Sequence, residues 1–240
     1  MTKAAIVIGA SGGLGQAVLA CLCERDDIEL VVAVSRSEQA GFSSPKLKWL
    51  AAPYTDEGME AVVSELQPLG LEVSRVVICN GILHTEQIQP EKRLEDVSMA
   101  AMVEVFKANT AVPVAWLKAL LPLLKGKQDC VLAAFSARVG SIGDNRLGGW
   151  YSYRASKSAL NMLLKTASIE FARRAKNVKL IAFHPGTTDT ALSKPFQQSV
   201  PEGKLFEPEF VAKRLLGIMD SAPVDGELDY VDWDGKPIDW

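Results

Sequence analysis

A tyrosine and a lysine four positions apart, Tyr153 and Lys157, are the side chains best suited to proton transfer in this chain. On a helix, residues at this spacing lie on the same face. A nearby ammonium group stabilises a phenolate and lowers the pKa of a tyrosine from its usual value of about 10. The spacing therefore predicts that Tyr153 can donate or accept a proton near neutral pH, with Tyr153 and Lys157 as catalytic residues.

A glycine-rich segment near the start of the chain has the features of an anion-binding loop. Glycines let the backbone approach a ligand closely, and the start of the following helix supplies N–H groups and a positive dipole. The spacing is G-x-x-x-G-x-G rather than G-x-G-x-x-G, and no Lys-Ser or Lys-Thr follows, which disfavours a nucleoside triphosphate. The alternative is a tight strand-to-helix turn, for which one or two glycines suffice. We predict cofactor contacts from Gly9, Ser11, Gly12, Gly13, Leu14 and Gly15.

The end of the second predicted strand, Val34-Ser35-Arg36, bears on the choice between NAD and NADP. Dinucleotide sites usually carry an acidic residue here, and a carboxylate would repel the extra phosphate of NADP. Ser35 can instead donate a hydrogen bond, and Arg36 can hold a phosphate through two parallel N–H groups. The sequence therefore favours NADP(H) over NAD(H), with an ordinary solvated arginine as the alternative.

Short apolar runs alternate with segments of helical periodicity along the whole chain. The runs lack polar alternation, which is typical of parallel strands covered on both faces. They predict a single α/β domain over residues 1–240, a Rossmann-type doubly wound parallel sheet of about seven strands with helices on both faces. The predicted strands are Ala4–Ile8, Leu30–Val34, Leu47–Ala51, Arg75–Cys79, Cys130–Phe135, Val178–Phe183 and Leu228–Val231. Predicted helices include Met59–Leu66, Met99–Phe106, Val114–Leu124, Ala155–Ala172 and one that begins at Leu14.

The composition indicates a globular protein and excludes several functional classes. Of the 240 residues, 48% are hydrophobic, which provides a substantial core and excludes a disordered chain. The 26 basic and 29 acidic residues give a net charge of −3, which argues against nucleic acid or anionic lipid as the main partner. Without a leader-like start or an apolar run of about 18 residues, we expect a cytoplasmic protein without a membrane partner. The cysteines and histidines lack metal-ligand spacing, so we expect no metal.

The glycine loop and the Y-x-x-x-K pair, in this order, resemble the short-chain dehydrogenase/reductase family over essentially the whole chain. Other similar positions are Cys79-Asn80-Gly81-Ile82, Asn109 in the long middle helix, and Pro185-Gly186-Thr187-Thr188-Asp189-Thr190. Within the family, segments 139–154 and 232–237 are similar to the C-factor (C-signal) and sniffer-like carbonyl reductase branch.

The resemblance implies hydride transfer between NADP and a carbonyl or alcohol. Tyr153 would act as acid or base, Lys157 would hold the nicotinamide ribose and depress the tyrosine pKa, and Asn109 would hold a water in the proton relay. Cofactor contacts are implied after two later strands, at Asn80, Gly81, Pro185, Gly186, Thr188 and Thr190.

One departure from the family pattern concerns a catalytic serine. The family's S-S-x-x-G, in which the second serine polarises the substrate oxygen, corresponds here to Ser136-Ala137-Arg138-Val139-Gly140. If Gly140 sets the register, Ala137 occupies the acting position. The hydroxyl would then come from Ser136, by a one-residue shift, or from Ser141, and we favour Ser136.

We therefore expect an NADP-dependent oxidoreductase acting on a small or medium carbonyl or alcohol substrate. The alternative is a C-factor-like dinucleotide-binding signalling or regulatory protein with little turnover. Residues 187–208 are expected to form a substrate loop with apolar contacts from Leu192, Phe196 and Val200. Apolar faces on Met99–Leu124 and Tyr153–Ala172 would suit a homodimer or homotetramer.

Overall fold

Seven strands form a parallel sheet. Their order across the sheet differs from their order along the chain. The computed structural model describes residues 2–37 and 42–240. The sheet order is β3-β2-β1-β4-β5-β6-β9, and each neighbouring pair is parallel. The strands are β1 Thr2–Ile8, β2 Leu30–Ser35, β3 Leu47–Ala51, β4 Leu71–Ile78, β5 Cys130–Phe135, β6 Val178–His184 and β9 Leu228–Asp232. The strand order reverses between β1 and β4, and sheets of this kind bind ligands at the carboxyl ends of the strands there.

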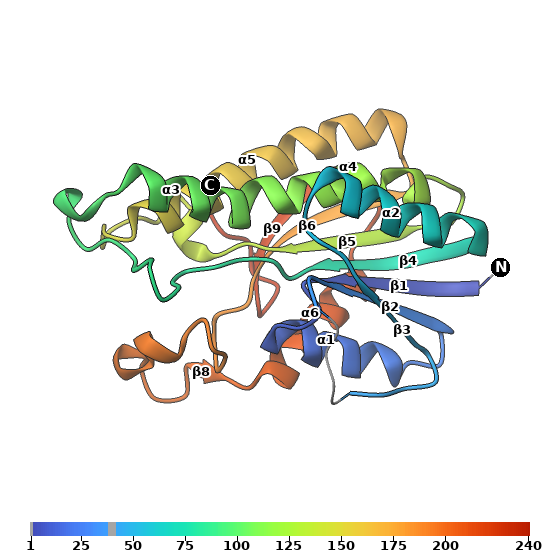
Figure 1. Ribbon diagram of the computed structural model, residues 1–240, viewed down its shortest axis with the longest axis horizontal. Helices are drawn as coiled ribbons and strands as arrows, with labels where there is room; N and C mark the ends of the chain where they lie inside the picture. The colour runs from blue at the N-terminus through green and yellow to red at the C-terminus, as the bar shows by residue number, and fades with distance from the viewer. Residues whose placement is uncertain (1, 38–41) are drawn as a thin grey trace.

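Helices cover both faces of this sheet (Figure 1). Helices α1 and α6 lie on one face, and α2, α4 and α5 lie on the other. The bounds are α1 Gly13–Cys23, α2 Asp56–Leu66, α3 Met99–Phe106, α4 Val112–Leu124, α5 Tyr151–Arg174 and α6 Pro208–Ser221. A π-helical turn, Lys107–Ala111, joins α3 to α4, and 3-10 turns occupy Gln67–Leu69, Leu94–Asp96, Arg138–Gly140 and Lys194–Ser199.

The strands are apolar because both of their faces are covered. All of β5 is buried, and successive side chains along it enter different cores. Leu132 packs in the core under α2, α4 and α5, whereas Ala133 packs in the core under α1 and α6. Each of the seven predicted strands overlaps an observed strand, and the predicted doubly wound α/β sheet is confirmed.

Two segments contain regular secondary structure that the sequence patterns did not predict. Helix α6 is absent from the predicted elements, although its buried residues Val211, Leu215 and Met219 follow helical spacing. The expected loop 187–208 contains two short strands, β7 (Thr187–Thr188) and β8 (Leu205–Phe206), which pair in parallel. A two-residue strand is too short to leave a period in the sequence, so only the pairing reveals it.

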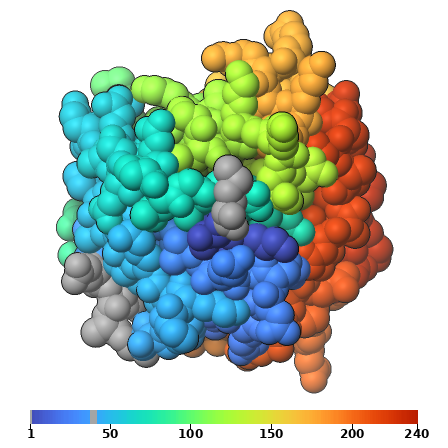
Figure 2. Space-filling model, turned by 90° about the vertical axis from the view of Figure 1, so that its right-hand side faces the viewer, coloured from blue at the N-terminus to red at the C-terminus, as the bar shows by residue number. Residues whose placement is uncertain are grey.

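The two ends of the strands present different surfaces. At the carboxyl ends, the orange segment that holds β8 extends beyond the sheet (Figure 1). At the opposite end, shown in Figure 2, the dark blue start of β1 lies at the centre of the face between the two helix layers. No helix in the described part of the chain has both the length and the apolar content needed to cross a membrane.

Candidate active site

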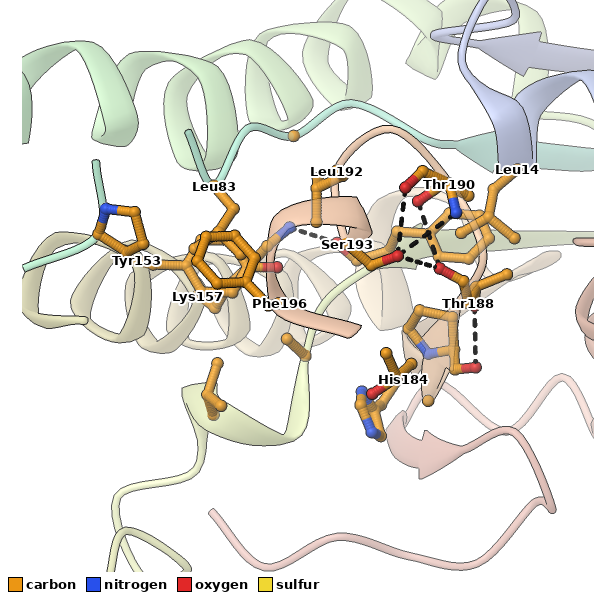
Figure 3. A pocket seen from close by; sticks show the side chains of 18 of the residues that line it. Leu14, Leu83, Tyr153, Lys157, His184, Thr188, Thr190, Leu192, Ser193 and Phe196 are labelled. Carbon is orange, nitrogen blue, oxygen red and sulfur yellow. Dashed lines mark hydrogen bonds between the residues drawn. The ribbon is translucent and has the colours of Figure 1, made fainter. Parts of the chain in front are cut away.

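A cavity of about 1090 Å³ lies at the carboxyl ends of the strands. Its walls come from the start of α1, the segments after β4, β5 and β6, and the start of α5. In Figure 3, Leu14 and Thr190 lie at one end of the cavity, and Tyr153 and Lys157 lie at the other. The fold therefore brings the glycine loop and the tyrosine-lysine pair, which are far apart in the sequence, into one cavity.

The glycine loop forms a cradle that side chains would fill. Gly9 has a φ of +77°, which residues with a Cβ rarely adopt. A Cβ on Gly15 would lie 2.5 Å from the carbonyl oxygen of Gly9. Gly12 is the N-cap of α1, and among the described residues no side chain caps this helix end and no acidic group stands in its first turn. Open N–H groups at a helix start, facing a cavity, fit the pyrophosphate of a dinucleotide.

The two predicted NADP-phosphate contacts have different environments. Ser35 is fully buried, and its hydroxyl donates a hydrogen bond to the carbonyl oxygen of Ser37. Arg36 is exposed, and its guanidinium lies 5.9 Å from the centroid of the Tyr54 ring, which is a cation–π contact. The exposed Arg36 is therefore better placed than the buried Ser35 to bind the phosphate of NADP. No sequence pattern had indicated its neighbour Tyr54.

Tyr153 and Lys157 lie one turn apart on α5, as expected, and both are buried. Lys157 Nζ donates a hydrogen bond to the Phe135 carbonyl oxygen at 2.7 Å and lies 5.9 Å from the centroid of the Tyr153 ring. Burial lowers the pKa of Lys157 to about 8 and raises the pKa of Tyr153 to about 12. The expected lowering of the tyrosine pKa is therefore not found here, because burial dominates and the ammonium is bound to a carbonyl group instead of the phenol.

Asn109 sits in the π-helical turn between α3 and α4 and is fully buried. Its Oδ1 accepts a hydrogen bond from the Ile82 N–H at 2.7 Å, and its Nδ2 donates to the Ile82 carbonyl and to Ser156 Oγ. A Cβ on Gly81 would lie 3.3 Å from both Asn109 Oδ1 and Lys157 Nζ. Through these hydrogen bonds, Asn109 holds the segment after β4 close to Lys157. Both of its amide hydrogens are used, so one lone pair of Oδ1 is left for the expected water.

The two candidate serines differ in their access to the cavity. Of the described residues, Ser136 is part of the lining and Ser141 is not. Ser141 Oγ accepts a hydrogen bond from the Asp144 N–H at 3.0 Å. The hydroxyl of Ser136 donates to Asn161 Oδ1 on α5 at 2.6 Å. The fold therefore places Ser136 at the cavity, with its hydroxyl directed to a neighbouring helix.

The other predicted contacts fall into two groups. The cavity is lined by Gly12, Gly13, Leu14, Gly15, Asn80, Gly81, Pro185, Gly186, Thr188 and Thr190, and by the expected apolar residues Leu192, Phe196 and Val200. Outside the lining are Gly9, Ser11, Ser35, Arg36 and Asn109. Asn80 Oδ1 is buried and accepts no hydrogen bond from the described residues, which leaves an acceptor for a ligand.

Two residues without any signal in the sequence shape the start of α5. Trp150 is its N-cap, with a φ of +52°, and its ring lies 6.1 Å from that of Tyr153 and 5.2 Å from that of Phe196. Glu91 is buried, and its carboxylate accepts hydrogen bonds from the N–H and the hydroxyl of Ser152. Glu91 therefore caps the helix that carries Tyr153 from a distant part of the chain, which no local pattern reveals.

The cavity lining is positively charged. Its described residues include Lys92, Lys157 and Lys204 but no aspartate or glutamate, which suits a ligand with phosphate groups. Burial, with a smaller contribution from Arg138, lowers the pKa of the lining residue His184 to about 4, so this histidine is neutral at pH 7. Within residues 2–37 and 42–240, no cluster of three or more His, Cys, Asp or Glu side chains could hold a metal ion.

Comparison with known proteins agrees with the resemblance seen in the sequence. A family model described as short chain dehydrogenase matches residues 3–201. The 1-hydroxy-2-glutathionyl-2-methyl-3-butene dehydrogenase of Rhodococcus sp. (strain AD45) is 27% identical over 239 residues, which cover 98% of each chain. The C-signal protein of Myxococcus xanthus is 29% identical over 147 residues, which cover 61% of this chain and 83% of that protein.

Solved structures share this fold over the full length of the chain. The carbonyl reductase Sniffer of D. melanogaster superposes with a TM-score of 0.86 at 19% identity, with 100% of both chains covered. An NADPH-bound carbonyl reductase from chicken fatty liver has a TM-score of 0.82 at 21% identity, with 100% of this chain and 99% of the other covered.

Proposed function

This chain belongs to the short-chain dehydrogenase family, and from that membership we propose that it is an NADP(H)-dependent oxidoreductase that interconverts a carbonyl compound and its alcohol. One observation carries the proposal: Tyr153 and Lys157 line the same cavity as the glycine cradle of α1. A dinucleotide seated on the cradle could therefore extend toward the tyrosine. Carbonyl reductases among the structural neighbours, one of them NADPH-bound, support the same chemistry.

Several parts of the chain would hold the cofactor. The N–H groups at the start of α1 would bind the pyrophosphate, and Arg36 would meet the 2′-phosphate of NADP. Lys157 would hold the nicotinamide ribose, and Asn80, with its free acceptor, would contact the cofactor after β4. When bound, NADPH supplies a hydride to a substrate carbonyl carbon.

Tyr153 would supply the proton. With its pKa raised to about 12, the phenol is protonated at neutral pH and can donate to the oxygen of a carbonyl that is being reduced. Lys157, with a pKa of about 8, carries a positive charge at pH 7 and would stabilise the phenolate that remains. Asn109 would keep the Gly81–Ile82 segment beside Lys157 and offer its remaining lone pair to a water in the proton relay.

In addition to Tyr153, a serine hydroxyl would contact the substrate oxygen, and its assignment is less direct. Ser136 is the favoured candidate from the sequence and lines the cavity. To contact a substrate, its hydroxyl would have to leave Asn161 Oδ1, to which it donates at 2.6 Å.

The function is tested by following the near-ultraviolet absorbance of NADPH in the presence of aldehydes, ketones and diketones. We expect oxidation of NADPH with some members of this panel, and a much slower reaction with NADH. The Tyr153→Phe variant serves as the matched blank, because it lacks only the hydroxyl. Rates that never exceed this blank would refute the proposal.

The regulatory alternative is not favoured. A protein that only senses NADPH has no need of a proton donor, yet Tyr153, Lys157 and Asn109 are assembled at one end of the cavity region. NADPH binding without turnover over the whole panel would revive this alternative.

We also propose that the chain forms a homo-oligomer through α3 and α5. Large apolar side chains are exposed on both helices, with Met99 82% and Met162 66% accessible. Sedimentation should give at least a dimer, and Met162→Glu combined with Val103→Glu should lower the mass. A wild-type monomer would contradict the proposal.

A further inference from the structure

Asn161 on α5 is the hydrogen-bond partner of Ser136 and lies behind the wall of the cavity. Among the described residues, Ser136 is part of the cavity lining, whereas the buried Asn161 is not. The Ser136 hydroxyl donates to Asn161 Oδ1 at 2.6 Å. Asn161 follows Lys157 by one helical turn, on the face of α5 that also carries Tyr153. An effect of Asn161 on a bound substrate must therefore pass through a lining residue such as Ser136.

The amide group of Asn161 has an unused donor. Its Nδ2 is buried and has no acceptor among the described residues, which is an unfavourable state for an N–H group. A Cβ on Gly140 would lie 3.2 Å from this nitrogen, so the turn after β5 closes over it. The donor stays unpaired as long as Oδ1 is the atom that faces Ser136.

Turning the amide over would give both of its ends a partner. The rotation exchanges Nδ2 and Oδ1 without changing the space that the side chain fills. Nδ2 would then donate to Ser136 Oγ, which is already at hydrogen-bond distance. Oδ1 would have a donor nearby, because the Tyr230 phenol interacts with Asn161. Burial raises the pKa of Tyr230, and polar interactions with Asn161 and Ser136 partly offset this rise.

We propose that Asn161 is a positioning residue that donates from Nδ2 to Ser136 Oγ when a substrate is bound, and thereby directs the Ser136 hydroxyl to the substrate oxygen. This inference rests on the proposed function and deepens it, because it supplies the rearrangement that the assignment of Ser136 requires. A hydroxyl has one hydrogen, so Ser136 cannot donate fully to Asn161 and to a substrate at the same time. Its oxygen can, however, accept from Asn161 while its hydrogen points to the substrate.

The substrate itself would favour the turned amide. Without a substrate, the Ser136 hydroxyl donates to Asn161 Oδ1. A carbonyl oxygen in the cavity offers a second acceptor for this hydroxyl, and Nδ2 then gains Ser136 Oγ as its own acceptor. Negative charge develops on the substrate oxygen as hydride arrives, and the N–H group of Asn161 polarises the hydroxyl that stabilises this charge. We therefore expect Asn161 to act on the chemical step more than on binding.

The test is a double-mutant cycle between positions 136 and 161. It uses NADPH and the compound that wild type reduces fastest among the panel of aldehydes, ketones and diketones. Ser136→Ala should lower kcat by about 10²–10³, the loss expected for one donor to a developing oxyanion. Asn161→Leu keeps the approximate size but neither donates nor accepts, and it should lower kcat at least about tenfold. In the Ser136→Ala background the same change should have almost no effect, because Asn161 acts through Ser136.

A second variant at the same position makes the cycle independent of how Asn161→Leu folds. The carboxylate of Asn161→Asp accepts hydrogen bonds but cannot donate one, so it would keep the Ser136 hydroxyl turned away from the substrate. The loss in kcat should again be at least about tenfold larger with Ser136 present than in the Ser136→Ala background, so that any effect of the new charge on Lys157 cancels.

Two measurements control for a general disturbance of α5. NADPH affinity, followed by fluorescence, should be unchanged in every variant. Ser168→Ala removes another buried hydroxyl from this helix, one that donates to the Lys165 carbonyl oxygen, and it should leave kcat unchanged.

Three results would overturn the inference and leave the proposed function intact. The first is a kcat that Asn161→Leu leaves unchanged or raises, which would show that Oδ1 only withholds the Ser136 hydroxyl. The second is an equal loss in both backgrounds, which would give Asn161 a structural role alone. The third is a silent Ser136→Ala. If wild type oxidises NADPH with no compound of the panel, the proposed function fails, and the inference with it.

Discussion

Gly140 lies against Lys157 so closely that one added carbon would come within 2.9 Å of the Cβ of the lysine. This contact joins the turn after β5 to α5, the helix that carries Tyr153. The close approach therefore ties the turn that follows Ala137 to the helix that carries Tyr153 and Lys157.

Gly140→Ala should disturb both stability and turnover. The added methyl group overlaps the backbone of Lys157, which cannot move without moving α5, so we expect the free energy of unfolding in urea to fall by about 1–3 kcal/mol. Turnover should fall further than the loss of folded protein explains. Gly126→Ala is the matched control, because a Cβ there has no described atom within 4 Å. Equal effects of the two substitutions would show that the contact is unimportant.

Tyr153→Phe should abolish turnover while leaving NADPH affinity nearly unchanged. The substitution removes the proton donor but keeps the buried ring and its contacts with Trp150. Steady-state rates and fluorescence titration measure the two properties separately. Tyr151→Phe removes a hydroxyl from an exposed side chain on the same helix and should be silent. Substantial reduction of a good substrate by Tyr153→Phe would exclude the proposed mechanism.

The rate of carbonyl reduction should fall as pH rises above about 8. Burial lowers the pKa of Lys157 to about 8, so the folded protein holds the lysine proton below this pH and loses it above. The positive charge that stabilises the Tyr153 phenolate disappears with that proton, whereas Tyr153, with a pKa of about 12, stays protonated. In Lys157→Met the residual activity should be low and its alkaline limit should move to higher pH. An unchanged alkaline limit would assign it to another group.

Arg36→Ala should weaken NADPH binding and leave NADH binding almost unchanged. A charged hydrogen bond to the 2′-phosphate is expected from the guanidinium, and NADH lacks this phosphate. Titration with both nucleotides gives the two dissociation constants, and wild type should prefer NADPH. Arg173→Ala, at the far end of α5, controls for the loss of one exposed positive charge. Equal affinities in wild type would contradict the assignment of NADP(H).

The amino-acid sequence determined the sheet, the glycine cradle and the tyrosine-lysine pair because each depends on neighbours in the chain. Apolar runs such as Cys130–Phe135 record burial on both faces, and the four-residue spacing of Tyr153 and Lys157 sets a common helix face wherever the helix packs.

Tertiary structure alone decided the hydrogen-bond partners and the pKa values of the side chains at the site. Ser136 and Ser35 are the same residue type, yet the hydroxyl of Ser136 donates to Asn161 Oδ1 and that of Ser35 donates to the Ser37 carbonyl oxygen. The pKa of Tyr153 rises, against the expectation from its helical neighbour, because desolvation depends on every segment packed around the phenol. Glu91 caps α5 from a distant segment for the same reason: burial and hydrogen-bond partners are set by contacts between parts of the chain that no local spacing encodes.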